Sequence, residues 1–125
     1  MTREKLTVEV KEQEPATAIY ELNGDLYGDT EGYAFQEEVR QKIAGGTRRL
    51  VVDLASVKRI DSCGIGILAS ISISAQKASA GLVLASLPAR IEKILGVTWF
   101  LEFIDHAESI PEAISKLDQM EIKIN

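Results

Sequence analysis

Two almost wholly apolar runs, at residues 50–54 and 82–87, constrain most strongly how this chain can fold. The first run is Leu-Val-Val-Asp-Leu and the second is Leu-Val-Leu-Ala-Ser-Leu. Such runs are typical of strands that are covered on both faces, as in a parallel sheet with helices packed against it. Each run is followed by a helical pattern, so the sequence predicts an α/β fold.

The residues before the first run predict a hairpin and a helix. Leu6, Val8 and Val10 alternate with polar residues, which is the pattern of a half-buried strand. Pro15 interrupts this pattern, and residues 16–22 are expected to return as the second, antiparallel strand.

A turn is expected at residues 23–25 (Asn-Gly-Asp), and Thr30 can then cap a helix. The apolar residues of this helix recur every four positions: Phe35, Val39 and Ile43. Gly45 and Gly46 should end the helix, as glycine does past a helix C-terminus.

The second half of the chain continues the alternation. A long helix is expected over residues 62–79, with Gly81 marking its end. Pro88 suits the first turn of a helix with Ile91, Ile94 and Leu95 inward. Residues 100–104 are expected to form a short last strand.

Ser109-Ile-Pro-Glu112 has the spacing of a capping box, which predicts a terminal helix carrying Ala113, Ile114 and Leu117. The resulting order is ββαβαβαβα, in one domain over residues 1–125. This order predicts a mixed, mainly parallel sheet that begins with an antiparallel hairpin and carries about four helices, with right-handed crossovers.

Composition narrows the class of protein. Of 125 residues, 46% are hydrophobic and 26% charged, which is typical of a soluble globular protein. The net charge of −5 argues against a nucleic-acid binder, which needs a basic surface. No apolar run approaches the roughly 18 to 20 residues of a membrane span, and the charged N-terminus does not look like a signal peptide. With Cys63 as the single cysteine, no internal disulfide can form, and a cytoplasmic location is expected.

The segment with the most chemical information is Arg-Ile-Asp-Ser-Cys-Gly-Ile-Gly at residues 59–66. It follows a buried strand and begins a helix, so Asp61 and Ser62 should lie near the carboxyl edge of the sheet, where α/β proteins tend to place their sites. Unpaired N–H groups at a helix start favour a phosphate. Gly64 and Gly66 each reduce helix stability by about 1 kcal/mol relative to alanine, but they allow another backbone to approach.

Two interpretations of this segment remain open on spacing alone. Asp61 or Ser62 is simply the N-cap of the helix, and the glycines ease packing. Alternatively, Ser62 is both part of the cap and a switch, because a phosphate there would add about −1.5 to −2 charge without unfolding the domain. Asp61 would then deepen the negative patch.

The segment resembles the signature of the STAS family. Asp61-Ser62-Cys63-Gly64 stands between the apolar strand at residues 50–54 and an Ile-Gly-Ile-Leu sequence at 65–68. Leu-Asn-Gly-Asp-Leu at 22–26 followed by Thr30, the strand and proline at 81–88, and the helix at 91–95 are also similar to family segments. The resemblance covers nearly the whole chain.

In that family, anti-sigma-factor antagonists are phosphorylated on the serine directly after the motif aspartate, which is Ser62 by position. The resemblance implies that the unphosphorylated chain binds a serine kinase that doubles as an anti-sigma factor, of the histidine-kinase-like ATPase type. A metal-dependent serine phosphatase would reverse the modification, and the chain itself would need no cofactor. Partner contacts are expected at Asp25, Tyr27, Asp29, Lys58, Arg59, Asp61, Ser62, Cys63, Gly64 and Ile65. Tyr27 is a departure, because the family often has aspartate there.

Other residues are expected to have structural roles. Cys63 is expected to be a small buried or partly buried residue rather than a nucleophile, and His106 to lie in a surface loop. The aromatic cluster at residues 99–101 is expected in the core. Arg48, Arg49, Lys58 and Arg59 are expected to be solvated. In the long helix, Gly64, Leu68, Ile71 and Ala75 fit a core stripe, while Ile65 and Ala69 could face a partner.

Three other functions and a zinc site compete with the phosphorylation switch. An enzyme is disfavoured because Ser62 lacks the Gly-Xaa-Ser-Xaa-Gly elbow and no phosphate-binding loop ending in Gly-Lys-Ser/Thr is present. A zinc site is disfavoured by one histidine and one cysteine. A STAS scaffold in a stress-signalling complex, or an accessory of a membrane transporter, is the main alternative, and nucleotide binding at residues 61–66 is another.

Overall fold

The computed structural model describes residues 3–98 and 100–120. Along the chain, the elements are β1 (Thr7–Gln13), β2 (Thr17–Leu26), α1 (Thr30–Ala44), β3 (Arg49–Ile60), α2 (Ser62–Lys77), β4 (Gly81–Ala85), α3 (Ala89–Val97), a 3₁₀ helix (Phe100–Glu102), β5 (Asp105–Ala107) and α4 (Ile110–Gln119). The predicted α/β fold with four α-helices is confirmed.

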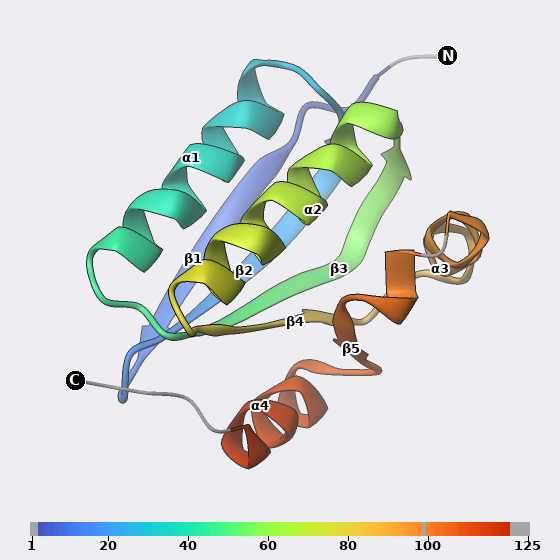
Figure 1. Cartoon of the computed structure of the whole chain (residues 1–125). Coiled ribbons are helices and arrows are strands. Elements are labelled where there is room, and N and C mark those ends of the chain that lie inside the picture. The colour runs from blue at the N-terminus through green and yellow to red at the C-terminus, as the bar shows by residue number, and fades with distance from the viewer. Residues whose placement is uncertain (1–2, 99, 121–125) are drawn as a thin grey trace.

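The strands form one five-stranded sheet in the order β1-β2-β3-β4-β5. β1 and β2 are antiparallel, and all later neighbours are parallel, as the sequence predicts. α1 and α2 lie side by side on one face of the sheet, and α4 lies on the other (Figure 1). Both faces of β3 and β4 are therefore covered, which explains their apolar runs.

The core has two parts, one on each face of the sheet. The larger part lies under α1 and α2 and includes the predicted residues Phe35, Val39 and Ile43. The smaller part joins the sheet to α4 through Ala113 and Leu117. No helix in the described part of the chain combines the length and the apolar character that crossing a membrane requires.

The predicted turn at residues 23–25 is wrong, because β2 continues through it to Leu26. Its pairing with β3 shifts register twice, between Glu21 and Asn23 and between Gly24 and Asp25. Gly24 has φ +108°, and a Cβ on it would lie 2.6 Å from the carbonyl oxygen of Lys5. The glycine therefore permits a bulge against the N-terminal segment, not a chain reversal.

The predicted strand at residues 100–104 is also wrong. Phe100–Glu102 is a 3₁₀ helix, and β5 begins only at Asp105, where the chain pairs with Val83 of β4. His106 accordingly lies in a strand and not in a surface loop. Phe100 and Leu101 are half-buried against the larger core, in line with the expected core role, while Trp99 lies outside the described residues.

Two smaller differences concern element ends. Gly81 is the first residue of β4, and α2 ends at Lys77, shortly before Ser79 takes a positive φ of 56°. β1 is more exposed than a half-buried strand, because it lies at the edge of the sheet: Val8 is partly buried and Val10 is 38% exposed.

Candidate functional site

The site is built on the starts of the two neighbouring helices α1 and α2. Asp61 is the N-cap of α2, and its Oδ1 accepts a hydrogen bond of 2.7 Å from the Gly64 N–H. Ser62 is the first residue of the helix and is exposed. Asp29, not Thr30, is the N-cap of α1, and its Oδ1 accepts from the Gly32 N–H at 2.9 Å. The predicted cap at Thr30 is therefore wrong by one residue.

The two helix starts are packed against each other closely. A Cβ on Gly64 would lie 2.1 Å from the Leu26 carbonyl oxygen, and a Cβ on Gly28 would lie 2.3 Å from Cys63 Cβ. Because neither position has room for a side chain, the loop after β2 fixes the position of the loop that carries Ser62. The predicted close backbone approach at Gly64 is present, whereas no atom lies within 4 Å of a Cβ built on Gly66.

Asp25 and Arg59 form the main ion pair beneath this edge of the sheet. They are register partners in β2 and β3. Arg59 Nε donates to Asp25 Oδ1 at 3.1 Å, and Nη2 donates to Oδ2 at 2.8 Å, so the pair is bidentate. The Asp25 side chain is fully buried and the Arg59 side chain is 22% exposed. The expectation that Arg59 is solvated is therefore wrong.

Burial alone would raise the pKa of Asp25, since it penalises the charged carboxylate. The hydrogen bonds from Arg59 and from the Glu4 N–H outweigh burial, and the pKa of Asp25 lies below its ordinary value. Asp25 is therefore ionised at neutral pH and serves as an internal anchor, held by Arg59 and the Glu4 N–H.

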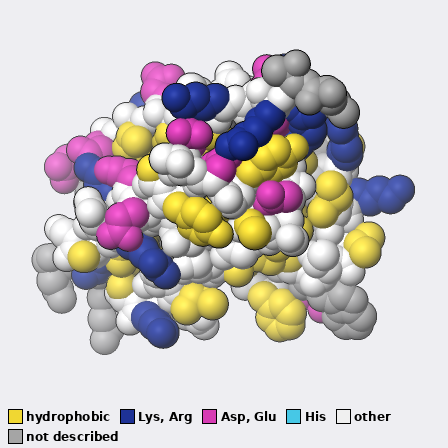
Figure 2. Space-filling model, turned by 90° about the horizontal axis from the view of Figure 1, so that it is seen from above, with side chains coloured by type: hydrophobic (Ala, Val, Ile, Leu, Met, Phe, Trp, Pro, Cys, Tyr) yellow, Lys and Arg dark blue, Asp and Glu magenta, His cyan; other side chains and the backbone are white. Residues whose placement is uncertain are grey.

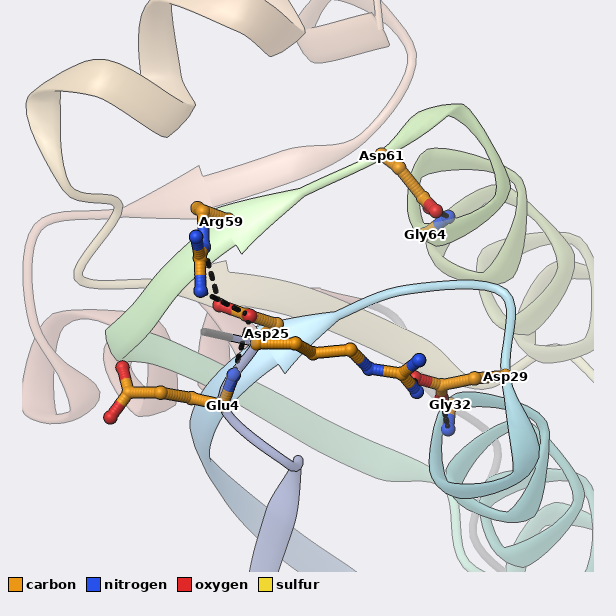
Figure 3. A network of polar contacts seen from close by, with 8 residues as sticks. Glu4, Asp25, Asp29, Gly32, Arg59, Asp61 and Gly64 are labelled. Atoms are coloured by element: carbon orange, nitrogen blue, oxygen red, sulfur yellow. Dashed lines mark hydrogen bonds and ion pairs between the residues drawn. The ribbon is translucent and has the colours of Figure 1, made fainter. Parts of the chain in front are cut away.

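The N-terminal segment contributes contacts that the sequence did not indicate. Glu4 donates its N–H to Asp25 Oδ2 at 2.8 Å and accepts from the Asp25 N–H at 2.9 Å. Arg3 forms an ion pair with Asp29, and its guanidinium lies 5.7 Å from the centre of the Tyr27 ring. Figure 3 shows the Asp25 carboxylate directed toward Arg59 and Glu4.

Most of the predicted partner residues near β2 and β3 make contacts within the chain. Lys58 is exposed, with its Nζ 3.5 Å from a carboxylate oxygen of Glu4. Tyr27 and Asp29 are half-buried under Arg3. Arg48 and Arg49 are not simply solvated, because Arg48 donates to the Ile43 and Thr47 carbonyls and Arg49 pairs with Asp118.

Cys63 is exposed, so the expectation of a buried or partly buried residue is wrong. Only every third or fourth residue of α2 faces the sheet, and Cys63 falls on the outer side of the first turn. The thiol lies beside the Tyr33 hydroxyl, a neighbour that the sequence did not indicate. Cys63 and Asp61 raise the pKa of Tyr33, with Cys63 as the larger cause.

Along α2 the predicted core stripe is confirmed, since Gly64, Leu68, Ile71 and Ala75 are buried. Ile65 and Ala69 are half-buried, and Ile73 is 51% exposed.

The edge viewed from above in Figure 2 carries hydrophobic side chains between acidic and basic ones, so no single sign of charge covers it. Within residues 3–98 and 100–120, no group of three or more His, Cys, Asp or Glu side chains could hold a metal ion.

The predicted site residues differ in how exposed they are in the structure. Asp61, Ser62, Cys63 and Lys58 are exposed, Ile65, Tyr27, Asp29 and Arg59 are half-buried, and Gly64 and Asp25 are buried. A phosphate on Ser62 would enter solvent at the start of α2, whose first turn contains no acidic residue. The positive end of the helix could accommodate such a group.

Solved structures of similar fold include an anti-sigma factor antagonist from Mycobacterium paratuberculosis, with 17% identity over 91% of this chain and 95% of that chain, and a TM-score of 0.79. The unphosphorylated form of the Bacillus anti-sigma factor antagonist SpoIIAA is 15% identical over 91% of this chain and 98% of that chain, with a TM-score of 0.76. A sulfate transporter family protein from Wolinella succinogenes is 18% identical over 87% and 90%, with a TM-score of 0.71.

A comparison with the sequences of curated proteins found no match. The sequence profile of the STAS domain matches residues 7–113, which include both helix starts and every predicted partner residue. The chain is a member of the STAS domain family.

Proposed function

We propose that the protein is an anti-sigma-factor antagonist that binds its anti-sigma factor when Ser62 is unmodified and is released when Ser62 is phosphorylated. The anti-sigma factor would itself be a serine kinase of the histidine-kinase-like ATPase type, and a serine phosphatase would restore the binding form. In this proposal the chain is not an enzyme, needs no cofactor of its own and acts in the cytoplasm.

The observation that carries the proposal is the exposed position of Ser62 at the start of α2, directly after the capping Asp61. A kinase can reach this hydroxyl without opening the fold. The Asp61 cap and the glycine contact at Leu26 hold the helix start in place, so the phosphate would change the charge of the surface and leave the fold intact. SpoIIAA, which shares the fold, has structures in both unphosphorylated and phosphorylated forms.

One phosphate is large enough to act as the switch. A hundredfold loss of partner affinity corresponds to about 2.8 kcal/mol. A phosphate placed within an interface is desolvated and is repelled by nearby acidic groups, and Asp61 already supplies one negative charge there. A partner surface that fits Asp61 and the unmodified Ser62 would therefore reject the modified form.

The first test is intact-mass spectrometry with site mapping on protein isolated from its native cells, before and after phosphatase treatment. An addition of about 80 daltons that maps to Ser62 and disappears with phosphatase is expected. If the protein stays unmodified across growth and stress conditions, the Ser62 switch is wrong even though the family assignment stands.

The second test measures binding to an anti-sigma-factor serine kinase with ATP and magnesium present. Ser62→Ala should bind constitutively, and Ser62→Asp should bind at least about a hundredfold more weakly. Thr30→Asp is the matched control, because Thr30 is the first residue of α1, as Ser62 is of α2. Equal loss in both aspartate variants would point to a general charge effect.

A scaffold or transporter-accessory role is the second candidate, and the similarity to the Wolinella sulfate transporter family protein favours it. Co-purification with membrane transporter subunits, or recovery in large salt-stable assemblies, would support that role. Titration with ATP and GTP tests the remaining expectation of nucleotide binding at residues 61–66.

A further inference from the structure

The outer edge of β1 has no pairing strand in the part of the chain that the structure describes. Such an edge presents unpaired N–H and C=O groups and can pair with another strand. β1 is a regular strand of seven residues, Thr7–Gln13, and its inner edge pairs with β2 along its whole length. The outer edge is therefore long enough to accept a complete strand.

The face of β1 toward α1 is partly apolar and exposed. Val10 is 38% exposed and Val8 is partly buried. With Ala34 and Phe35 of α1, they line an open groove of about 360 Å³. α1 covers the inner part of this face and leaves the outer margin of β1 accessible.

The opposite face of β1 carries charges that the monomer pairs incompletely. Glu9 lies directly opposite Glu21 of β2, which places two carboxylates across from one another. Like charges in this position destabilise a sheet. Lys11 is the nearby cation, and its Nζ lies 2.8 Å from Glu21 Oε2, so it neutralises Glu21 more directly than Glu9.

We propose that β1 is a self-association edge, on which a second copy of this chain adds its own β1 in antiparallel register centred on Val10. In this register each residue of one copy faces a residue of the other copy, and the two residue numbers add up to 20. Glu9 then faces Lys11 of the second copy, and Lys11 faces Glu9 of the second copy. The two copies form one continuous sheet related by a two-fold axis, which is the commonest symmetry of homo-oligomers.

Charge selects this register from its neighbours. With a two-fold axis perpendicular to the sheet, the α1 sides of the two copies lie on the same face of the joined sheet. The two facing residue numbers must then have an even sum, so the neighbouring registers have sums of 18 and 22. A sum of 18 places Glu9 opposite Glu9, and a sum of 22 places Lys11 opposite Lys11. Only the register centred on Val10 pairs opposite charges, and it also overlaps all seven residues of both strands.

The same register suits the groups around the strand. On the helix side, Val10 meets Val10 of the second copy, which buries its exposed surface. Glu12 remains in its ion pair with Lys42 of α1 in each copy. On the opposite face, the added Lys11 offsets the repulsion between Glu9 and Glu21. The proposal does not depend on Ser62 and stands or falls separately from the proposed function.

Sedimentation equilibrium of the full chain, over a dilution series from millimolar to micromolar and at low salt, tests the proposal. The native chain should show a reversible monomer–dimer equilibrium. Glu9→Lys alone and Lys11→Glu alone should each weaken dimerisation about tenfold or more, because each creates two like-charge pairs per dimer. The double variant Glu9→Lys/Lys11→Glu should restore the dimer, and an equimolar mixture of the two single variants should form a heterodimer.

Glu37→Lys on α1 and Lys93→Glu on α3 are matched controls. Both residues are exposed, and the two substitutions change the charge by the same amounts as the test variants do, at positions away from β1. They should dimerise like the native chain, and thermal unfolding followed by circular dichroism should show that every variant is folded. A native chain that stays monomeric throughout the series overturns the proposal. A dimer that is insensitive to both single variants also overturns it, because its interface must then lie elsewhere.

Discussion

The starts of α1 and α2 have the same local sequence pattern and the same cap, yet they differ in their surroundings. Residues 29–32 and 61–64 each read aspartate, hydroxyl residue, any residue and glycine. In both, the aspartate accepts from the glycine N–H three residues later. Local sequence thus determines the cap but does not distinguish the two segments.

The difference comes from neighbours that are distant in sequence. Asp29 is half-buried and pairs with Arg3, and Glu31 adds an acidic group to the first turn of α1. Asp61 is exposed, forms no ion pair among the described residues, and is followed by a first turn without acidic residues. The two starts therefore differ in charge: the capping carboxylate of α1 is paired with a cation, whereas that of α2 is exposed and has no ion pair among the described residues.

The largest expected effect is on the packing that joins the two helix starts. Gly64→Ala should destabilise the protein by about 3 kcal/mol, because the new Cβ would overlap the Leu26 carbonyl oxygen. Gly66→Ala, two residues along the same helix, is the control and should stabilise the protein by about 1 kcal/mol. Urea unfolding measures both. If both substitutions have the same effect, or if Gly66→Ala is the more destabilising one, α2 does not pack on the loop after β2.

Asp25→Asn should have the next largest effect, a loss of about 2 to 3 kcal/mol in unfolding free energy. The substitution leaves the Arg59 guanidinium without its carboxylate, and the loss is smaller than for a fully buried pair because Arg59 is 22% exposed. If Asp25→Asn unfolds at the same urea concentration as the native chain, the ion pair does not support this edge of the sheet.

The ion pair of Asp25 with Arg59 should also make the stability of the protein depend on pH. The pKa of Asp25 is lower in the folded chain than its ordinary value of 3.8, so its contribution to stability is complete above that value and is lost as pH falls through the lowered pKa. The stability difference between the native chain and Asp25→Asn should therefore be constant between about pH 5 and pH 7 and shrink below about pH 4. A difference that instead grows on acidification would contradict the assigned direction.

Removing the caps compares the two helix starts directly. Asp61→Ala should lose about 1 kcal/mol, which is the usual value of an N-cap hydrogen bond. Asp29→Ala should lose somewhat more, because it also removes the ion pair with Arg3. Thermal unfolding of the two variants measures this gap, and an identical loss in both would mean that Arg3 adds nothing to α1.

The smallest effect is expected for Arg3→Ala, about 0.5 kcal/mol, because the Arg3 side chain is 51% exposed. Its value lies in a double-mutant cycle with Asp29→Ala. In the Arg3→Ala background, the losses from Asp29→Ala and Asp61→Ala should become equal. A gap that persists would have to come from another neighbour of Asp29.

Features that depend on local pattern could be predicted from the sequence. The order of elements, the core positions Phe35, Leu68 and Ala113, and the placement of Asp61 at a helix start follow from periodicity and capping chemistry. The family resemblance added the assignment of Ser62, which periodicity alone could not provide.

Features that depend on long-range contacts could not be predicted. Asp25 and Arg59 are 34 residues apart, and Arg3 and Asp29 are 26 apart, so no local pattern marks either pair. Asn-Gly-Asp reads as a turn, and only the bulge against Lys5 shows why the glycine lies inside a strand. Tyr33 beside Cys63 likewise depends on how α1 packs against α2.

The order of strands in the sheet has a consequence for how the chain acquires its structure. Each strand pairs with the one that precedes it in sequence, from β1 to β5. During synthesis, the hairpin can form first, and every later strand can then add to an edge that already exists. The loops that must close are short compared with those of a sheet whose neighbours are far apart in the chain, which favours rapid folding. The last strand to arrive, β5, has only three residues, so the growing edge ends in a strand too short to recruit another chain.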